Sequence, residues 1–361
     1  MQNTKLFETF KLGNTELKNR IVMAPMTRSR AIGNVPNALM AEYYGQRAGA
    51  GLIVTEGTSP SPNGLGYARI PGIFSKEQVE GWKLVTNAVH SKGGKIFLQI
   101  MHTGRIGHEA NLPEGAKVAA PSAIKAAGQM WTDTMQMQDH PVPSAFTSDE
   151  LKSTKKEYVT AAKNAIEAGF DGIELHGANG YLLEQFISPH SNKREDEYGG
   201  SIENRCRFVI ETAKECADAI GKERVAIRLS PYGAFNDMPA YPETEETYKY
   251  LASEINKIGL VYIHIVDHSS MGAPEVPRKI KETIRDEFKN TLILSGGYGL
   301  ESADKELNGI ADLVAFGKPF INNPDLVDRL KNGWPLNTNL NMDAFYTPDE
   351  KGYTDYPFYT K

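Results

Sequence analysis

Short apolar runs recur eight times along the chain, and glycine or charged residues bound each of them. Runs of this length and uniform hydrophobicity are typical of parallel strands that are covered on both faces. Between the runs, apolar residues recur at a spacing of three to four, which is the pattern of amphipathic helices. The predicted strands are Ile21–Met26, Leu52–Glu56, Lys95–Ile100, Gly172–Leu175, Val225–Leu229, Val261–Val266, Leu292–Leu294 and Leu313–Phe316.

Capping residues precede several of the helical segments, and glycines follow them. Two pairs, Ser75 with Gln78 and Thr147 with Glu150, match the capping box, in which the two side chains satisfy free backbone N–H groups at a helix start. Glycines follow the periodic segments and predict where the helices stop. The first predicted helix begins after Ser75 and ends at Gly93-Gly94. The others are Leu151–Ala168, Ser201–Ile220 and Glu245–Ile258, which end at Gly169, Gly221 and Gly259 respectively.

Eight strands that alternate with helices predict an α/β fold, a closed (β/α)₈ TIM barrel formed as one domain over residues 1–361. The competing arrangement is a doubly wound open sheet. No Gly-x-Gly-x-x-Gly follows an early strand, which disfavours the dinucleotide-binding form of that alternative. Leu6–Leu17 predicts an N-terminal hairpin that closes the other end of the barrel, and residues 103–146 predict a long lid insertion after the third strand.

Composition and charge limit the kinds of binding partner that we expect. The chain has 361 residues and a formal net charge of −5, and no cluster of lysine and arginine indicates nucleic acid or an anionic membrane. Cys206 and Cys216 are the only cysteines, which fits a reducing compartment. No apolar stretch approaches the roughly 20 residues that span a bilayer. We therefore expect a cytoplasmic protein, a monomer or homodimer, that acts on small molecules.

The ends of the predicted strands offer candidate chemistry, because the active site of such a barrel lies at their C-terminal ends. His176, Asn179 and Tyr181 follow a buried strand, and the intervening Gly177 and Gly180 allow the backbone to turn. A lone histidine there is often only a hydrogen-bonded core residue. Together, however, two neutral donors can hold a carbonyl oxygen and stabilise charge on it, and a tyrosine can supply a proton.

Other strand ends indicate a phosphorylated cofactor. Glycines follow the seventh and eighth strands, where exposed backbone N–H groups and a lysine can hold a phosphate. Arg228 lies within a strand and is expected to point inward, so it needs an anionic partner. That partner is either a buried salt bridge with Glu174 or an electron-rich group of the cofactor. The expected phosphate-binding residues are Gly296, Gly297, Gly317 and Lys318.

A metal centre is a third interpretation of the same strand ends. His102, His176, His264 and Asp267 can be imagined to converge as the ligands of a metal-dependent hydrolase. No strand carries a His-x-His pair, and glycines occupy the positions that such a site would fill. We therefore expect no metal.

Several motifs together resemble the old yellow enzyme family of FMN-dependent ene reductases, in particular its classical bacterial branch, and the resemblance covers nearly the whole chain. It is carried by Ala24-Pro25-Met26-Thr27-Arg28, Gln99 to Arg105 (Gln-x-x-His-x-Gly-Arg), His176 to Arg207, Asn323-Pro324-Asp325-Leu326 and Gly352 to Pro357. The resemblance implies an NAD(P)H oxidoreductase that reduces the activated C=C bond of α,β-unsaturated carbonyl and nitro compounds. Two alternatives remain. The main role is then the reduction of nitroesters or nitroaromatics, or the protein binds flavin without enone turnover.

The resemblance also implies residue roles. Hydride would pass from NADPH or NADH to FMN, and from flavin N5 to the substrate, with Tyr181 protonating the product. FMN would be bound by Pro25, Met26, Thr27, Gly57, Gln99, Arg228, Gly296, Gly297, Gly317 and Lys318. The substrate would be bound by His176, Asn179, Tyr67 and Tyr346.

Two positions depart from the family pattern. Lys318 stands where arginine is common, so a point charge without a planar fork would meet the phosphate. Met101 stands where tryptophan is frequent, and its flexible thioether would reshape the pocket. Thr27 in place of cysteine argues against the thermophilic-type branch, and Asn179 in place of histidine is a variation within the family.

Overall fold

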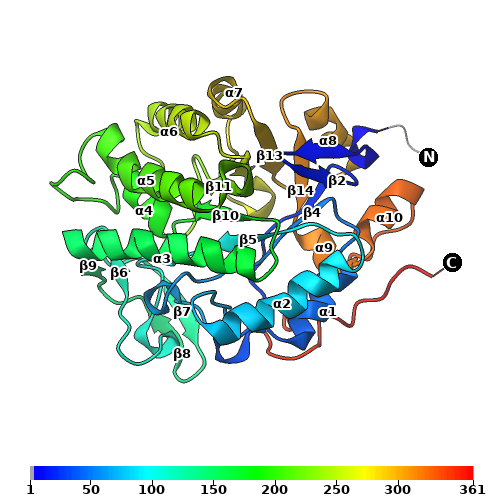
Figure 1. The fold of residues 1–361 in the computed structure, drawn as a ribbon, viewed down its shortest axis with the longest axis horizontal. Coiled ribbons are helices and arrows are strands. Elements are labelled where there is room, and N and C mark those ends of the chain that lie inside the picture. Colours follow the sequence, from blue (N-terminus) through cyan, green and yellow to red (C-terminus); the bar gives the residue numbers. More distant parts are fainter. Residues whose placement is uncertain (1–3, 361) are drawn as a thin grey trace.

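The computed structural model describes residues 4–360, and within them eight parallel strands close into a barrel (Figure 1). Each strand pairs with the next along the chain, and β10 pairs with β5 on one side and β11 on the other, which confirms the predicted (β/α)₈ fold. The strands are β3 (Ile21–Met23), β4 (Leu52–Val54), β5 (Ile96–Ile100), β10 (Gly172–Gly177), β11 (Val225–Leu229), β12 (Tyr262–Val266), β13 (Thr291–Ser295) and β14 (Leu313–Phe316).

The strand ends differ from the prediction by a few residues. The first strand stops at Met23 rather than Met26, and Pro25 beyond it has no N–H to give to a sheet. The second stops at Val54, and beyond it the Glu56 carboxylate accepts bonds from the Tyr44 hydroxyl and the Arg28 N–H. The fourth strand instead continues to Gly177.

Helices surround the barrel, and the four that the sequence predicts begin within three residues of their predicted starts. Ser75 with Gln78 and Thr147 with Glu150 both form complete capping boxes. The other six helices within residues 4–360 had no predicted bounds, and Asn37 caps the first of them by accepting the Met40 N–H. The helices are α1 (Ala38–Gln46), α2 (Lys76–His90), α3 (Ser148–Glu167), α4 (Leu182–Ile187), α5 (Ile202–Ile220), α6 (Thr244–Ile258), α7 (Arg278–Glu287), α8 (Leu300–Leu307), α9 (Lys318–Asn322) and α10 (Leu326–Asn332). Short 3₁₀ turns lie at Lys5–Phe7, Ile32–Asn34, Pro62–Gly64, Glu109–Asn111, Lys222–Arg224 and Ser269–Met271. None of the helices in residues 4–360 is both long and apolar enough to cross a bilayer.

The predicted N-terminal hairpin is present as β1 (Phe10–Leu12) and β2 (Thr15–Leu17), which lie beside α8 (Figure 1). Its tip residue Gly13 has a φ of +54°, a conformation that glycine adopts at no steric cost. Leu12 and Leu17 are buried in one cluster with residues of the barrel strands, including Ala226. The hairpin thus closes the end of the barrel opposite the strand C-termini.

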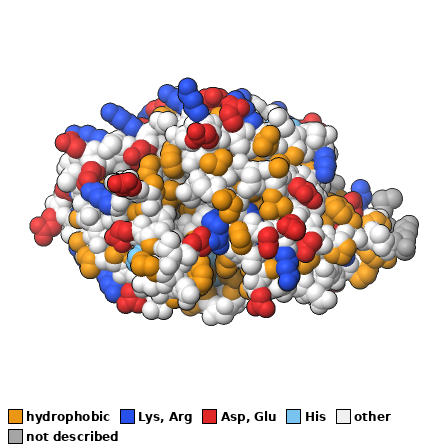
Figure 2. Space-filling view, turned by 90° about the horizontal axis from the view of Figure 1, so that it is seen from below, with side chains coloured by type: hydrophobic (Ala, Val, Ile, Leu, Met, Phe, Trp, Pro, Cys, Tyr) orange, Lys and Arg blue, Asp and Glu red, His pale blue; other side chains and the backbone are white. Residues whose placement is uncertain are grey.

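The predicted insertion between β5 and α3 folds over the other end. It holds the short strands β6 (Ala119–Ala120) and β9 (Ser144–Ala145), which pair in parallel, and an antiparallel hairpin of β7 (Gln129–Thr132) and β8 (Gln136–Asp139). The hairpin projects at the bottom of Figure 1. On the face shown in Figure 2, basic and acidic side chains are interspersed, with hydrophobic side chains between them.

Candidate functional site

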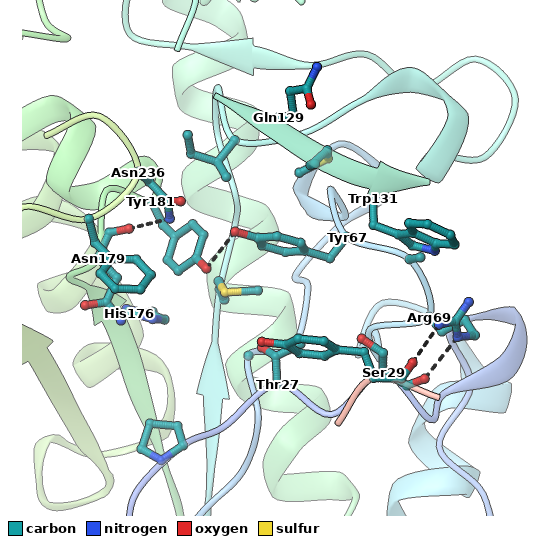
Figure 3. A pocket seen from close by; sticks show the side chains of 18 of the residues that line it. Thr27, Ser29, Tyr67, Arg69, Gln129, Trp131, His176, Asn179, Tyr181 and Asn236 are labelled. Atoms are coloured by element: carbon teal, nitrogen blue, oxygen red, sulfur yellow. Dashed lines mark hydrogen bonds between the residues drawn. The ribbon is translucent and has the colours of Figure 1, made fainter. Parts of the chain in front are cut away.

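A cavity of about 800 Å³ lies at the C-terminal ends of the barrel strands, beneath the inserted hairpin. Its walls come from strand ends, from the insertion, from the loop between β11 and α6, and from the C-terminal segment near Tyr346 (Figure 3). Eleven of the residues singled out from the sequence line it together: Pro25, Thr27, Gly57, Tyr67, Gln99, Met101, His176, Asn179, Tyr181, Arg228 and Tyr346.

Five of the residues expected to bind FMN do not line this cavity: Met26, Gly296, Gly297, Gly317 and Lys318. Gly296 and Gly297 follow β13, while Gly317 and Lys318 follow its neighbour β14. The two turns therefore lie side by side, and the Met26 sulfur lies 3.6 Å from where a Cβ on Gly317 would be. The fold brings this group together beside the cavity rather than inside it.

A tight turn after β10 presents the three central side chains. Gly177 lies so close to β11 that an added Cβ would stand 3.0 Å from the Arg228 carbonyl oxygen. Asn179 adopts a φ of +59°, which asparagine tolerates better than most residues. Tyr181 then stands at the N-cap position of the short helix α4, without a capping bond from its side chain. This conformation places His176, Asn179 and Tyr181 on one wall of the cavity (Figure 3).

A buried carboxyl group supports the turn from behind. Glu184 accepts hydrogen bonds from the Gly180 N–H (2.6 Å), the Ser230 hydroxyl (2.7 Å) and the Tyr248 hydroxyl (2.9 Å). Burial raises its pKa to about 7, although all three hydrogen bonds act in the opposite direction. Ser230 also accepts the Asn179 N–H at 2.8 Å. Glu184 therefore holds the turn both directly and through Ser230.

The His176 imidazole is a neutral donor. Its pKa lies well below the usual value, first because the ring is buried and then because the Arg228 cation lies on the adjacent strand position. Its Nδ1 has no hydrogen-bond partner among the described residues. The Tyr181 ring packs edge-on against it, with centroids 4.9 Å apart. A neutral ring carries one N–H, so His176 can donate one hydrogen bond to a ligand oxygen.

The Tyr181 hydroxyl donates a hydrogen bond to the Tyr67 hydroxyl across the cavity, at 3.0 Å between the two oxygens (Figure 3). Burial raises the pKa of both phenols, and the bond to Tyr67 partly counteracts the rise for Tyr181. Tyr181 therefore stays protonated throughout the neutral range. Such a phenol can give its proton only to a strongly basic atom.

Arg228 points into the cavity without a hydrogen-bonded partner among the described residues. The side chain is 5% exposed, and its guanidinium makes no hydrogen bond to any residue in the described range 4–360. Glu174, the alternative partner considered from the sequence, is bound by Gln99 (2.8 Å), Tyr262 (3.0 Å) and His264 (2.9 Å) instead. The two side chains therefore form no hydrogen-bonded salt bridge, although the charge of Glu174 still favours the Arg228 cation, and the guanidinium remains available for a ligand.

These residues fit the FMN that the sequence resemblance implies. A buried guanidinium without a partner suits an electron-rich ring edge, because a charge in such a place is costly unless it is paired. The backbone N–H groups of Gly296 and Gly297 donate no hydrogen bond to the described residues, and Lys318 is exposed next to them. Gly57 packs closely against Met101, because an added Cβ would stand 2.5 Å from the Met101 sulfur.

The histidines considered as metal ligands have other partners or lie apart. His264 bridges Glu174 and Ser295, and Asp267 pairs with Lys281 at 2.9 Å. His102 is buried and accepts the Gly104 N–H. Within residues 4–360, no three His, Cys, Asp or Glu side chains are placed to hold a metal ion.

Several cavity residues were not found from the sequence. Asn236 donates to the Asn179 carbonyl oxygen at 2.7 Å, and Phe235 beside it also lines the cavity. Arg69 pairs with Asp133 of the inserted hairpin and donates to the Tyr346 carbonyl oxygen at 2.8 Å. Trp131 lies next to this pair (Figure 3). Except for Trp131 in β7, these residues come from loops, where no periodic pattern marks the side chains that point inward.

Comparisons with known proteins agree with this geometry. The sequence profile of the NADH:flavin oxidoreductase / NADH oxidase family matches residues 5–337. A probable flavin mononucleotide-dependent alkene reductase of Leishmania infantum is 42% identical over 96% of this chain and 95% of its own length. Morphinone reductase in complex with tetrahydroNAD has a TM-score of 0.93 and 43% identity, covering 99% and 98% of the two chains. The old yellow enzyme homologue of Zymomonas mobilis has a TM-score of 0.94 and 40% identity, covering 98% and 99%.

Proposed function

The chain belongs to the NADH:flavin oxidoreductase / NADH oxidase family and is an FMN-dependent oxidoreductase of the old yellow enzyme type, and we propose that it reduces the activated C=C bond of α,β-unsaturated carbonyl and nitro compounds. One arrangement carries the proposal. A neutral imidazole, a carboxamide and a protonated phenol share one wall of a cavity into which the unpartnered Arg228 also points. This set can hold an oxygen, stabilise charge on it and deliver a proton.

Bound FMN supplies the hydride, and NAD(P)H is its source, as the tetrahydroNAD complex of morphinone reductase supports. Pro25, Thr27, Gly57 and Gln99 would hold the ring from the strand ends that line the cavity. Gly296, Gly297, Gly317 and Lys318 would bind the phosphate, with Met26 packed beside Gly317. Arg228 would stabilise negative charge on the ring.

The substrate oxygen would lie between His176 and Asn179, with Tyr67 and Tyr346 lining the pocket around it. When the β-carbon accepts hydride, the C=C π bond breaks and its electrons move toward that oxygen. The two donors stabilise the developing charge and cost no reorganisation, because the protein already fixes them. The α-carbon becomes basic at this stage, which is the condition under which the Tyr181 phenol can protonate it.

A direct test combines cofactor binding with turnover. We expect purified protein to bind FMN, to bleach on anaerobic addition of NADPH or NADH, and to regain its colour when 2-cyclohexenone is added, with cyclohexanone as product. Replacing His176 and Asn179 together by alanine should weaken binding of a phenol far more than binding of FMN. The proposal fails if reduced holoenzyme leaves enones, nitroalkenes and maleimides unchanged. Equal losses of phenol and FMN binding would show that the two donors only support the fold.

A further inference from the structure

A second histidine contacts the wall formed by His176, Asn179 and Tyr181 from outside it. His268 follows β12, and its Nε2 lies 2.8 Å from the side-chain oxygen of Asn179. A carboxamide oxygen only accepts hydrogen bonds, so the His268 ring donates in this contact. The amide nitrogen of Asn179 has no partner among residues 4–360, and Asn179 lines the cavity. The donor end of the carboxamide is thus the end left for a ligand.

The backbone of Asn179 is already fixed on both sides. Its N–H donates to the Ser230 hydroxyl at 2.8 Å, and its carbonyl oxygen accepts from the Asn236 side chain at 2.7 Å. The positive φ of the residue also restricts where the side chain can point. What remains free is rotation of the carboxamide about its last bond, which exchanges an acceptor for a donor at the cavity wall. His268 is the described residue that resists this exchange.

The surroundings of His268 suit this task. Its ring packs against Phe235 with centroids 4.9 Å apart at an angle of 36°, which limits its motion. Burial and the nearby Arg228 cation lower its pKa to about 4, while Asp267 acts in the opposite direction. The ring is therefore neutral near pH 7 and places its single N–H on Asn179. No second described group takes this hydrogen bond.

We propose that His268 is a positioning residue that holds the Asn179 carboxamide with its NH₂ group toward the cavity, so that the site selects ligands that present a hydrogen-bond acceptor. The proposal rests on the proposed function, in which Asn179 holds the substrate oxygen. It identifies the chemical feature that ligands must share, a carbonyl, nitro or phenolate oxygen. Ligands of the same shape that present N–H groups are disfavoured, because two donors would face each other.

The test uses FMN-loaded protein and two ligands of equal shape, 4-methylphenol and 4-methylaniline, with calorimetry as the readout. His268→Phe keeps an aromatic ring against Phe235 but removes the donor, whereas His268→Gln can still donate. We expect His268→Phe to weaken phenol binding about fivefold to tenfold and to narrow the preference for phenol over aniline. His268→Gln should stay within about threefold of wild type in both respects. FMN content and thermal unfolding of each variant report on folding.

A double-mutant cycle separates positioning from a general structural effect. In the Asn179→Ala background there is no carboxamide to orient, so adding His268→Phe should change phenol binding less than about twofold. An equal loss in both backgrounds would overturn the proposal, as would wild-type binding in His268→Phe. If wild-type holoenzyme bound neither ligand and reduced no enone, the proposed function itself would fail. Normal enone turnover with an unchanged His268→Phe would contradict only the role of His268.

Discussion

The hydroxyl oxygens of Tyr181 and Tyr67 lie 3.0 Å apart, and their rings are almost perpendicular, at 85° with centroids 6.1 Å apart. Tyr67 comes from the loop after β4 and Tyr181 from the turn after β10, so distant parts of the chain meet at one hydrogen bond. The bond counteracts the effect of burial on the pKa of Tyr181. Tyr67 thereby eases the release of the proton that Tyr181 is proposed to give.

The tyrosine pair predicts graded kinetic effects. Tyr181→Phe should slow reoxidation of reduced enzyme by 2-cyclohexenone by about 10²-fold or more, the usual worth of a positioned acid. Tyr67→Phe removes only the supporting bond, worth ~1 kcal/mol, and should slow it about fivefold. Stopped-flow measurements should find flavin reduction by NAD(P)H unchanged in both. If enone turnover in Tyr181→Phe equals that of wild type, the proton comes from elsewhere.

Replacing Arg228 should have different effects on the stability of the apoprotein and on the flavin of the holoenzyme. A buried cation without a hydrogen-bonded partner contributes no stability of its own, so apoprotein with Arg228→Met should be at least as stable as wild type in urea unfolding. With FMN bound, the lost charge should lower the flavin reduction potential by about 30 to 60 mV, which is ~1.4 to 3 kcal/mol for two electrons.

Arg228→Lys is the matched control, because it keeps a charge at the same strand position. Its potential should lie between those of wild type and Arg228→Met. A strongly destabilised Arg228→Met apoprotein would show instead that the arginine serves the barrel core. An unchanged potential would place the flavin away from it.

Replacing Lys318 should affect only the binding of the FMN phosphate. Lys318→Ala should weaken FMN binding by about threefold to tenfold at low ionic strength, and the difference should shrink in high salt, because an exposed charge is screened. Lys318→Arg should retain or improve binding through its planar fork. Riboflavin lacks the phosphate and is the control ligand. Equal weakening of riboflavin and FMN would contradict a phosphate-specific role.

Glu184 predicts a pH dependence of stability. Its pKa is about 7 in the folded protein against 4.5 ordinarily, so between these values the folded state keeps a proton that the unfolded chain has released. Stability must then fall as the pH rises through this range, by up to ~3 kcal/mol for this group. Urea unfolding at pH 5.5 and pH 8 should show a steeper loss for wild type than for Glu184→Gln.

Glu56 is a second buried carboxyl group, and burial raises its pKa to about 7 as well. Glu184→Gln should therefore keep part of the decrease in unfolding free energy with rising pH. His102 acts in the opposite sense, because burial lowers its pKa to about 3 and stability is lost as the pH falls below 6.5. Comparing variants at the same two pH values removes this common contribution. Identical slopes in wild type and Glu184→Gln would mean that Glu184 is ionised in the folded protein.

The order of elements was readable from the sequence because it depends on local physics. Buried parallel strands need uninterrupted apolar runs, and helix ends need side chains that satisfy free N–H groups, as Ser75 and Thr147 do. Because the active site of such a barrel lies at the C-terminal ends of its strands, the predicted barrel also indicates where the site lies. His176, Asn179 and Tyr181 could then be placed there with their glycines, and the structure puts all three in the cavity wall.

The partners of those residues were decided only by the tertiary structure. Nothing local relates Arg228 to Glu174 or frees it from that carboxylate, because Gln99, Tyr262 and His264 come from other strands to take the bonds. His268 reaches Asn179 across 89 positions, and Tyr67 reaches Tyr181 across 114. Which atom a side chain contacts depends on how several loops pack together. The sequence determined the scaffold and the kinds of chemical groups at its mouth, while the packing of those loops determined their hydrogen bonds, charges and orientation.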